Sequence, residues 1–175
     1  MLALLATAAI VTLDGWKLWR SSRDMPKLGP LPDGGYAWES DAGRELLRNL
    51  TNLMALAVMM AAPWFLAERT GTDLAFLVVF DGLLAIHCIW LILPKRYAIT
   101  RSHLWVDGFR VDWTRLSWKG WKGGNRIVLL RRGWGVFAPL PVGGDVDHLA
   151  EAAVRIEAIE NDAWDAMVAA LSAEE

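Results

Sequence analysis

The stretch LTNLMALAVMMAAPWFLAERTGTDLAFLVVFDGLLAIHCIWLIL, residues 50–93, decides the fold class of this chain. Its first 18 residues (50–67) carry no charge, and its last 20 (74–93) carry a single carboxylate, Asp81. At ~1.5 Å per residue, helices of these lengths measure about 27 and 30 Å, which matches the hydrocarbon core of a bilayer. The short polar segment 68–73 separates them. We therefore expect a transmembrane helical hairpin.

Residues 1–19 form a third candidate span. Residues 1–13 are apolar, and the segment reaches ~28 Å when it runs on to Trp19, with the Lys17 amine extended to the interface. A signal peptide would need a basic region before the apolar one and a small-residue cleavage site after it, and the segment has neither. We expect an uncleaved anchor, with an interfacial helix as the alternative.

Positive charges predict the orientation of these spans. Residues 20–49 carry five Lys or Arg, residues 68–73 carry only Arg69, and Lys95 and Arg96 follow the last span at once. The positive-inside rule then places the N-terminus outside and residues 20–49 and 95–175 in the cytoplasm, at an inner (cytoplasmic) membrane.

The composition excludes several classes of protein. A hydrophobic content of 54 % excludes a disordered chain, and one cysteine excludes a secreted disulfide scaffold. A net charge of −2 argues against a simple nucleic-acid binder. Eleven tryptophans favour a chain with many half-apolar, half-wet positions, as membrane proteins have.

Residues 20–49 read as a cytoplasmic connection. Three Pro and several Gly within 25–35 exclude helix there, and Ser40 is a candidate N-cap for a short interfacial helix that leads into the second span. A partner-binding strap is the alternative to a plain linker.

After Pro94 the sequence pattern changes from helix to strand. Short β-prone runs are separated by turn signals at 107–108 and 123–125, and an amphipathic helix follows from residue 145, with a break near Asn161. The runs cover residues 97–100, 103–106, 109–113, 116–118, 126–130 and 135–138. The predicted fold class is a membrane α protein with a small α+β domain: three transmembrane helices, then a bent antiparallel β-sheet closed by a C-terminal amphipathic helix.

The second half of the chain resembles a known family. Tyr97, Ile99 and Thr100 are followed by Gly108, Trp113 and Leu116, then by an apolar strand at 127–130 and a Pro-bearing strand before the helix. In this order the residues resemble the bacterial pleckstrin-homology-like (PH-like) domains attached to membrane hairpins, over about 95–172. The resemblance implies an interaction or assembly module of a membrane protein, and it carries over no functional residues.

The net charge of the chain conceals a separation of charge. Residues 95–132 hold ten Lys or Arg against two acids, and residues 145–175 hold nine acids against one base. Either the basic stretch faces anionic lipid or an acidic partner, or the two stretches pack against each other. The candidate interaction residues on the basic stretch are Trp105, Trp118, Lys119, Trp121, Lys122, Arg131 and Arg132.

Catalytic and cofactor motifs are missing from the sequence. The three His show no metal-binding spacing, and there is no phosphate-binding Gly-rich loop or nucleophile elbow. His87 is a weak candidate for ligating haem or chlorin, but a lone membrane histidine is more often packed and hydrogen-bonded. We expect no metal and no cofactor, with bound lipid as the exception.

Asp81 is the most unusual residue. It lies about 11 Å into its span, where a carboxylate must be paired, protonated or turned toward protein. Helical spacing puts it on one face with Leu77, Leu84 and Cys88. The second span offers no polar group at that depth, whereas Thr7 of the first span does. A hydrogen bond within the chain, a contact with a partner subunit and an ion or proton path are the three interpretations.

These observations predict a non-enzymatic membrane subunit. It would pack on a larger complex, such as a respiratory or photosynthetic one, and would brace that complex or recruit a partner through its cytoplasmic domain. One alternative is a module that senses anionic lipid or a partner, and a second is a small transporter or enzyme component that uses Asp81. The expected partners are other membrane subunits and lipids, without nucleic acid.

Overall fold

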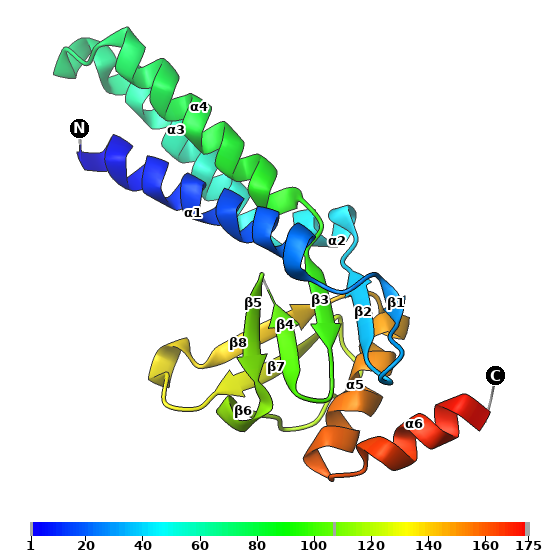
Figure 1. Cartoon of the computed structure of the whole chain (residues 1–175). Helices are drawn as coiled ribbons and strands as arrows, with labels where there is room; N and C mark the ends of the chain where they lie inside the picture. The colour runs from blue at the N-terminus through cyan, green and yellow to red at the C-terminus, as the bar shows by residue number, and fades with distance from the viewer. Residues whose placement is uncertain (1, 107, 174–175) are drawn as a thin grey trace. The chain divides into compact units, whose positions relative to one another are not determined.

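The computed structural model describes residues 2–106 and 108–173, and it divides into two compact units (Figure 1). The first unit joins Ala42–Pro94 to the N-terminal residues up to Leu18. The second joins Trp19–Asp41 to the residues from Lys95 onward. In chain order the elements are α1 (Leu2–Asp24), β1 (Gly29–Pro30), β2 (Tyr36–Glu39), α2 (Ala42–Arg48), α3 (Leu50–Thr70), α4 (Leu74–Ile92), β3 (Arg96–Ile99), β4 (His103–Val106), β5 (Phe109–Asp112), the 3-10 turn η1 (Trp113–Arg115), β6 (Leu116–Ser117), β7 (Arg126–Arg131), the 3-10 turn η2 (Gly135–Phe137), β8 (Pro139–Gly143), α5 (Val146–Glu160) and α6 (Trp164–Ala173).

The three expected spans are helices. Among the described residues, α1, α3 and α4 have 23, 21 and 19 residues and are long and apolar enough to cross a membrane. Gly71 ends α3 in the left-handed conformation, with φ 63°, and the Asp73 side chain accepts a hydrogen bond from the Ala75 amide at 2.9 Å to begin α4. These two caps reverse the chain within three residues, as the polar segment 68–73 predicted.

Helix α4 carries most of the packing in the first unit. It buries Leu77, Phe80 and Leu84, whereas α3 buries none of its residues. Helix α1 approaches α4 closely at Gly15, where an added Cβ would lie 3.2 Å from the Trp90 ring. The buried side chain of Asn49, just before α3, donates to the Leu91 carbonyl at 2.9 Å and ties the start of α3 to the end of α4.

The expectation of a plain linker before the second span is wrong in part. Residues 29–30 and 36–39 form β1 and β2, and β2 pairs with β3, with Trp38 opposite Tyr97. Trp38 is 1 % exposed, and its indole N–H donates to the Gly143 carbonyl at 2.9 Å. The strand escaped prediction because it is short, it lies between a Pro/Gly segment and a helix, and its partner is distant in sequence. The helix expected after Ser40 is present as α2.

The β-structure consists of two antiparallel sheets rather than one bent sheet. The first has the order β1-β2-β3-β4-β5, and the second has the order β6-β7-β8. The hairpin expected at 107–108 is confirmed by the pairing of Val106 with Phe109, although Asp107 itself lies outside the described residues. The prediction of a single bent sheet is therefore wrong: β5 and β6 belong to different sheets, with η1 between them.

The prediction of a strand at residues 135–138 is wrong. These residues form η2 and its C-cap, and the last strand, β8, begins only at Pro139. Its two prolines face Leu130 and Val128 of β7 on the outward side. Proline is tolerated there because β8 is an edge strand of its sheet. The apolar run before it resembled a strand, but it belongs to a turn that exposes its side chains.

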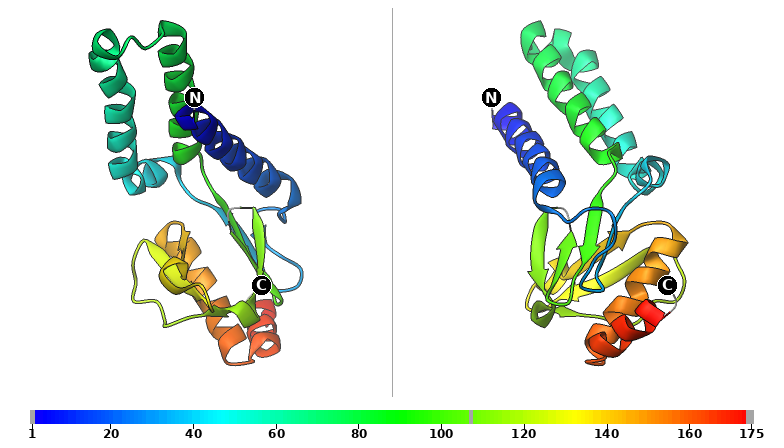
Figure 2. Two further views of the ribbon diagram at one scale, coloured as in Figure 1. Left: turned by 90° about the vertical axis from the view of Figure 1, so that its left-hand side faces the viewer. Right: turned by 45° about the vertical axis from the view of Figure 1, so that its right-hand side comes forward.

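One hydrophobic core holds the second unit together. Helix α5 contacts β2, β3 and β7 and appears in orange beside the strands in Figure 2. Asp145 caps it by accepting from the His148 amide at 2.8 Å, and it ends at Asn161, where the sequence predicted a break. The buried members of the core are Trp38, Tyr97, Ile99, Leu104, Val106, Leu116, Ile127, Leu129, Leu140, Val142, Leu149, Ala152, Ile156 and Trp164.

Candidate functional site

Asp81 has a hydrogen-bond partner within the chain. The indole N–H of Trp64, on α3, donates to Asp81 Oδ2 at 2.6 Å. Asp81 lies on the α4 face that carries the buried Leu77 and Leu84, as its spacing predicted. Its other oxygen, Oδ1, is buried and has no hydrogen-bond partner among the described residues.

The expectation that the second span offers no polar group at this depth is wrong. Trp64 lies six residues before Thr70, the end of α3, and Asp81 lies seven residues after Leu74, the start of α4. The two are therefore level in an antiparallel hairpin, and an indole N–H is a donor. Thr7 does not take this role, since its hydroxyl donates to the Ala3 carbonyl of its own helix at 2.9 Å.

His87 faces an acid of the first span. Its Nδ1 lies 3.4 Å from Asp14 Oδ2, although without the geometry of a hydrogen bond. The Lys17 amine lies 3.2 Å from the other oxygen of Asp14. This cluster joins α1 to α4. The sequence does not predict this cluster, because the pairing depends on how the two helices pack.

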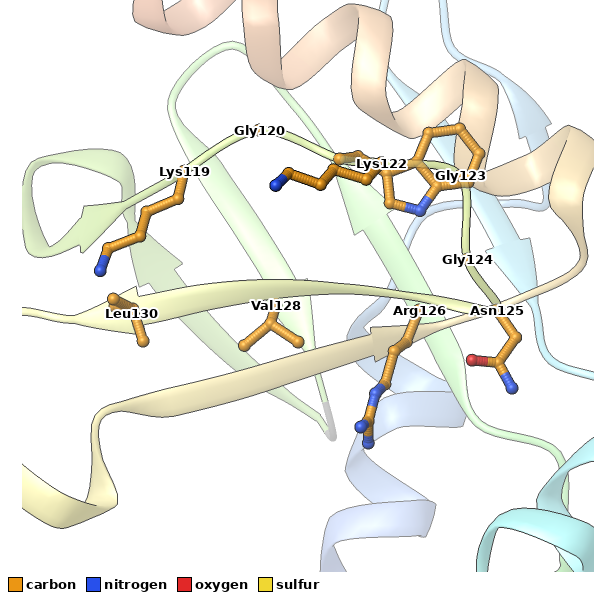
Figure 3. Close-up of a pocket in the computed structure, with 10 residues that line it drawn as sticks. Lys119, Gly120, Lys122, Gly123, Gly124, Asn125, Arg126, Val128 and Leu130 are labelled. Carbon is orange, nitrogen blue, oxygen red and sulfur yellow. The ribbon is translucent and has the colours of Figure 1, made fainter.

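A groove of about 510 Å³ lies in the second unit beside β7. Figure 3 shows the loop from Lys119 to Asn125 passing over the strand that carries Val128 and Leu130. The side chains of Lys119, Lys122 and Arg126 are exposed along it, and none of the three forms an ion pair with a described carboxylate. The groove thus combines an apolar floor with cations.

The two tryptophans expected beside this loop point inward. Trp118 and Trp121 are half-buried and pack against the core. The indole N–H of each is buried without a partner in the described part of the chain. Trp105 is half-buried on β4, opposite Arg110, whose guanidinium carbon lies 6.0 Å from the ring centroid.

The two arginines at the end of β7 contact different groups. The Arg131 guanidinium lies 4.2 Å from the centroid of the Trp134 ring and donates to the Phe137 carbonyl at 2.5 Å. Arg132 is exposed, and its Nε donates to the Leu116 carbonyl at 3.1 Å. The seven predicted interaction residues of the basic stretch therefore do not form one surface. They are divided between the groove, the core, the β4–β5 hairpin and the turn after β7.

Sequence reasoning missed the apolar turn between β7 and β8. Trp134, Val136 and Phe137 are 56 %, 87 % and 72 % exposed. The sequence pattern predicts a β-strand for residues 135–138. Its high glycine content, Gly133 and Gly135 around Trp134, was the signal that could have indicated a turn.

The basic and acidic stretches neutralise each other only slightly. Among the described residues one ion pair joins them, between Arg101 and Asp165, with N–O distances of 2.9 and 3.0 Å. Most of the positive charge on 95–132 therefore remains available to other groups.

A hydroxyl, an imidazole and a carboxylate meet on the β4–β5 hairpin. His103 Nδ1 lies 2.6 Å from Ser102 Oγ, and His103 Nε2 lies 2.7 Å from Asp112 Oδ1. His103 and Asp112 are direct cross-strand partners, and Thr100 also bonds the His103 backbone, at 3.0 Å from its carbonyl. We infer that these three side chains stabilise the β4–β5 hairpin.

The residues that the structure describes contain no cluster of three His, Cys, Asp or Glu side chains that could hold a metal ion. No protein-family model, no curated protein and no solved structure matches this chain.

Proposed function

We propose that this chain is a non-enzymatic accessory or assembly subunit of a larger membrane complex, such as a respiratory or photosynthetic one. Its spans pack on that complex, and its extramembrane domain braces it or recruits a partner. The positive charges support an orientation with the N-terminus outside and the domain in the cytoplasm.

The unburied surface of α3 carries this proposal. None of the α3 residues is buried, and an apolar groove of about 410 Å³ runs between α3 and α4. Met59, Pro63, Leu66, Phe76 and Phe80 are among its lining residues. Helices associate in membranes by close van der Waals packing, and a groove of this kind fits the side chains of a partner helix.

The pairing of polar groups within the spans also supports it. Asp81 bonds Trp64, and Asp14 lies beside Lys17 and His87. A partner helix in the α3–α4 groove would therefore meet an apolar surface. The position of His87 beside Asp14 favours packing over ligation of a haem or chlorin.

A PH-like domain belongs to the same proposal. The run of antiparallel strands followed by the amphipathic helix α5 supports it, as does the order of the residues that carry the resemblance. Such a module would act by binding rather than by chemistry.

Photo-crosslinking from the groove tests the proposal. A photoreactive amino acid is placed at Met59, which lines the groove, and in a control at its neighbour Val58, which is exposed but is not among the lining residues. After purification in mild detergent, we expect a second membrane protein to be linked from position 59 and not from 58. A chain that purifies as a stable monomer, or equal linking from both positions, would contradict the proposal.

The cationic groove of the domain favours a second candidate function, the sensing of anionic lipid. Its three cations face no described carboxylate, so a phosphate group could bind them. Lipid that co-purifies with the full chain can be identified by mass spectrometry. We expect the triple variant Lys119→Gln, Lys122→Gln, Arg126→Gln to lose anionic lipid and the control Lys27→Gln to keep it; equal retention would argue against this function.

A further inference from the structure

The turn between β7 and β8 exposes three large apolar side chains of the second unit. Val136 and Phe137, at 87 % and 72 %, are its most exposed large apolar residues among those described. Trp134, at 56 %, stands beside them. Grouped exposed apolar side chains of this size mark a contact with a protein or a membrane, since water solvates them poorly.

The turn is held in a defined shape. Gly133 and Gly135 adopt positive φ, 82° and 52°, which lets the chain reverse around Trp134. The Phe137 amide bonds the Trp134 carbonyl at 3.0 Å, and Arg131 lies over the Trp134 ring while it donates to the Phe137 carbonyl. Hydrogen bonds within the turn and the contact of Arg131 with the Trp134 ring thus hold the exposed side chains in a defined arrangement.

Two exposed arginines flank this turn. Arg115 and Arg132 are exposed and adjacent, because the Arg132 amide donates to the Arg115 carbonyl at 2.8 Å. Neither forms an ion pair with a carboxylate in the part of the chain that the structure describes. An apolar tip with arginines at its base matches the boundary between acyl chains and anionic headgroups.

We propose that this turn inserts Trp134, Val136 and Phe137 into the headgroup–acyl boundary of the bilayer that the same chain crosses. Arg115 and Arg132 then bind anionic headgroups. The turn appears in yellow between β7 and β8 in Figure 1. The inference deepens the second candidate function, lipid sensing, and rests on the three spans.

The bilayer is the expected binding partner of this turn, because the spans of the same chain tether the domain close to it. Only residues 93–95 separate the end of α4 from the start of β3, so the domain is tethered a few residues from a membrane surface. Such a tether gives a high effective concentration of lipid, and a weak contact then suffices. Tryptophan favours the interfacial region because its ring system is apolar while its indole N–H meets polar groups. Phenylalanine is common on the apolar face of segments that lie at this interface.

A fluorescent probe at residue 136 tests this inference in the full chain. Cys88 is the only cysteine, so Cys88→Ser provides a background for Val136→Cys labelled with a polarity-sensitive dye. Val154→Cys on α5 is the water-exposed control, and Phe65→Cys on α3 is the bilayer control. Each labelled chain is placed as a single copy in lipid nanodiscs, with or without anionic lipid and with nitroxide groups on the lipid.

In anionic discs we expect the emission of the probe at 136 to shift to shorter wavelength and to be quenched by a nitroxide near the headgroup. Replacing Arg115 and Arg132 by glutamine should lower the equilibrium constant for insertion by about fivefold per arginine at low salt. Emission and quenching equal to those of the control at 154 would overturn the inference. A blue shift without quenching by lipid would also overturn it, because it would show burial against protein.

The outcome is independent of the accessory-subunit proposal. The discs contain no other protein, so a chain without any partner subunit can still insert the turn. Conversely, a probe at 136 that stays in water would leave the crosslinking from Met59 unaffected.

Discussion

The carboxylate of Asp81 and the indole of Trp64 form a polar pair inside a stretch that is otherwise apolar. A carboxylate at this depth is costly unless a donor reaches it, and the Trp64 N–H does so at 2.6 Å. This geometry favours the first of the three interpretations of Asp81, a structural hydrogen bond within the chain.

A double-mutant cycle on this pair should give a coupling free energy of about 0.6–1.7 kcal/mol, between the average and the maximum found for hydrogen bonds between membrane helices. Trp64→Phe and Asp81→Leu are made singly and together, and unfolding is followed in mixed micelles. Thr7→Val is the matched control, since that hydroxyl bonds only within its own helix.

A coupling near zero would contradict the structural role of the pair. If Asp81→Asn left stability unchanged but abolished a transport or enzymatic activity, the result would support the alternative function that uses Asp81.

Tyr36 makes the stability of the second unit sensitive to high pH. Burial, followed by the charge of Glu151, raises the pKa of Tyr36 above 10.0, while Arg155 opposes the shift. The folded state therefore keeps its phenol proton at a pH where the unfolded chain has lost it. Stability from this group is full below pH 10.0 and falls as the pH rises from there through the folded pKa.

Chemical denaturation between pH 8 and pH 11 checks this effect of Tyr36. The decline in unfolding free energy above about pH 10 should be smaller in Tyr36→Phe than in the unmodified chain. An identical decline in both proteins would show that Tyr36 does not contribute.

At the scale of elements, β2 makes the connection between α1 and α2 part of the domain. Trp38 fills the centre of the core and stacks on Tyr97, with ring centroids 5.5 Å apart. Two further bonds hold the preceding loop: the Trp164 indole donates to the Asp33 carbonyl at 3.0 Å, and Arg155 donates to the Gly34 carbonyl at 2.9 Å.

Trp38→Ala should destabilise the second unit by about 3–5 kcal/mol, because it empties a large buried site and removes the bond to the Gly143 carbonyl. Trp105→Ala is the control on the same sheet, and it should have a much smaller effect since that ring is only half-buried. Thermal unfolding followed by near-ultraviolet circular dichroism measures both. Equal losses would mean that β2 does not anchor the core.

Strands with a strong local pattern were predictable, and strands that depend on distant partners were not. The runs that became β3, β4, β5 and β7 alternate clearly and are separated by turn residues, and all four are confirmed. Tyr36–Glu39 was missed because its hydrogen bonds go to β3, in register with Arg96–Ile99. The prediction of a strand at residues 135–138 was wrong because the sequence of an apolar run does not show whether its side chains are buried or exposed.

At the scale of the whole molecule, the second unit is discontinuous in sequence. It takes β1 and β2 from residues before the hairpin and the rest from residues after it. The membrane hairpin is thus inserted between two parts of one domain, and the core of that domain combines Trp38 from the first part with residues of the second.

A fragment of residues 95–175 should therefore fail to fold, whereas residues 26–41 joined to it by a flexible linker should restore a folded domain. Dispersion of the amide signals in a proton–nitrogen correlation spectrum distinguishes the two. The control is the same fusion of residues 26–41 to the fragment, carrying Trp38→Ala. A folded fragment without residues 26–41 would contradict the discontinuous domain.

The sequence by itself determined the three apolar helices, the tight turn between the last two, most strands and the closing amphipathic helix. These follow from local composition, periodicity and capping, which act over a few residues. Only the tertiary structure decided that Trp64 meets Asp81, that Asp14 meets His87, that Trp118 and Trp121 turn inward, and that the connection supplies a strand. Each of these depends on which distant elements pack together, and local patterns carry no record of that pairing.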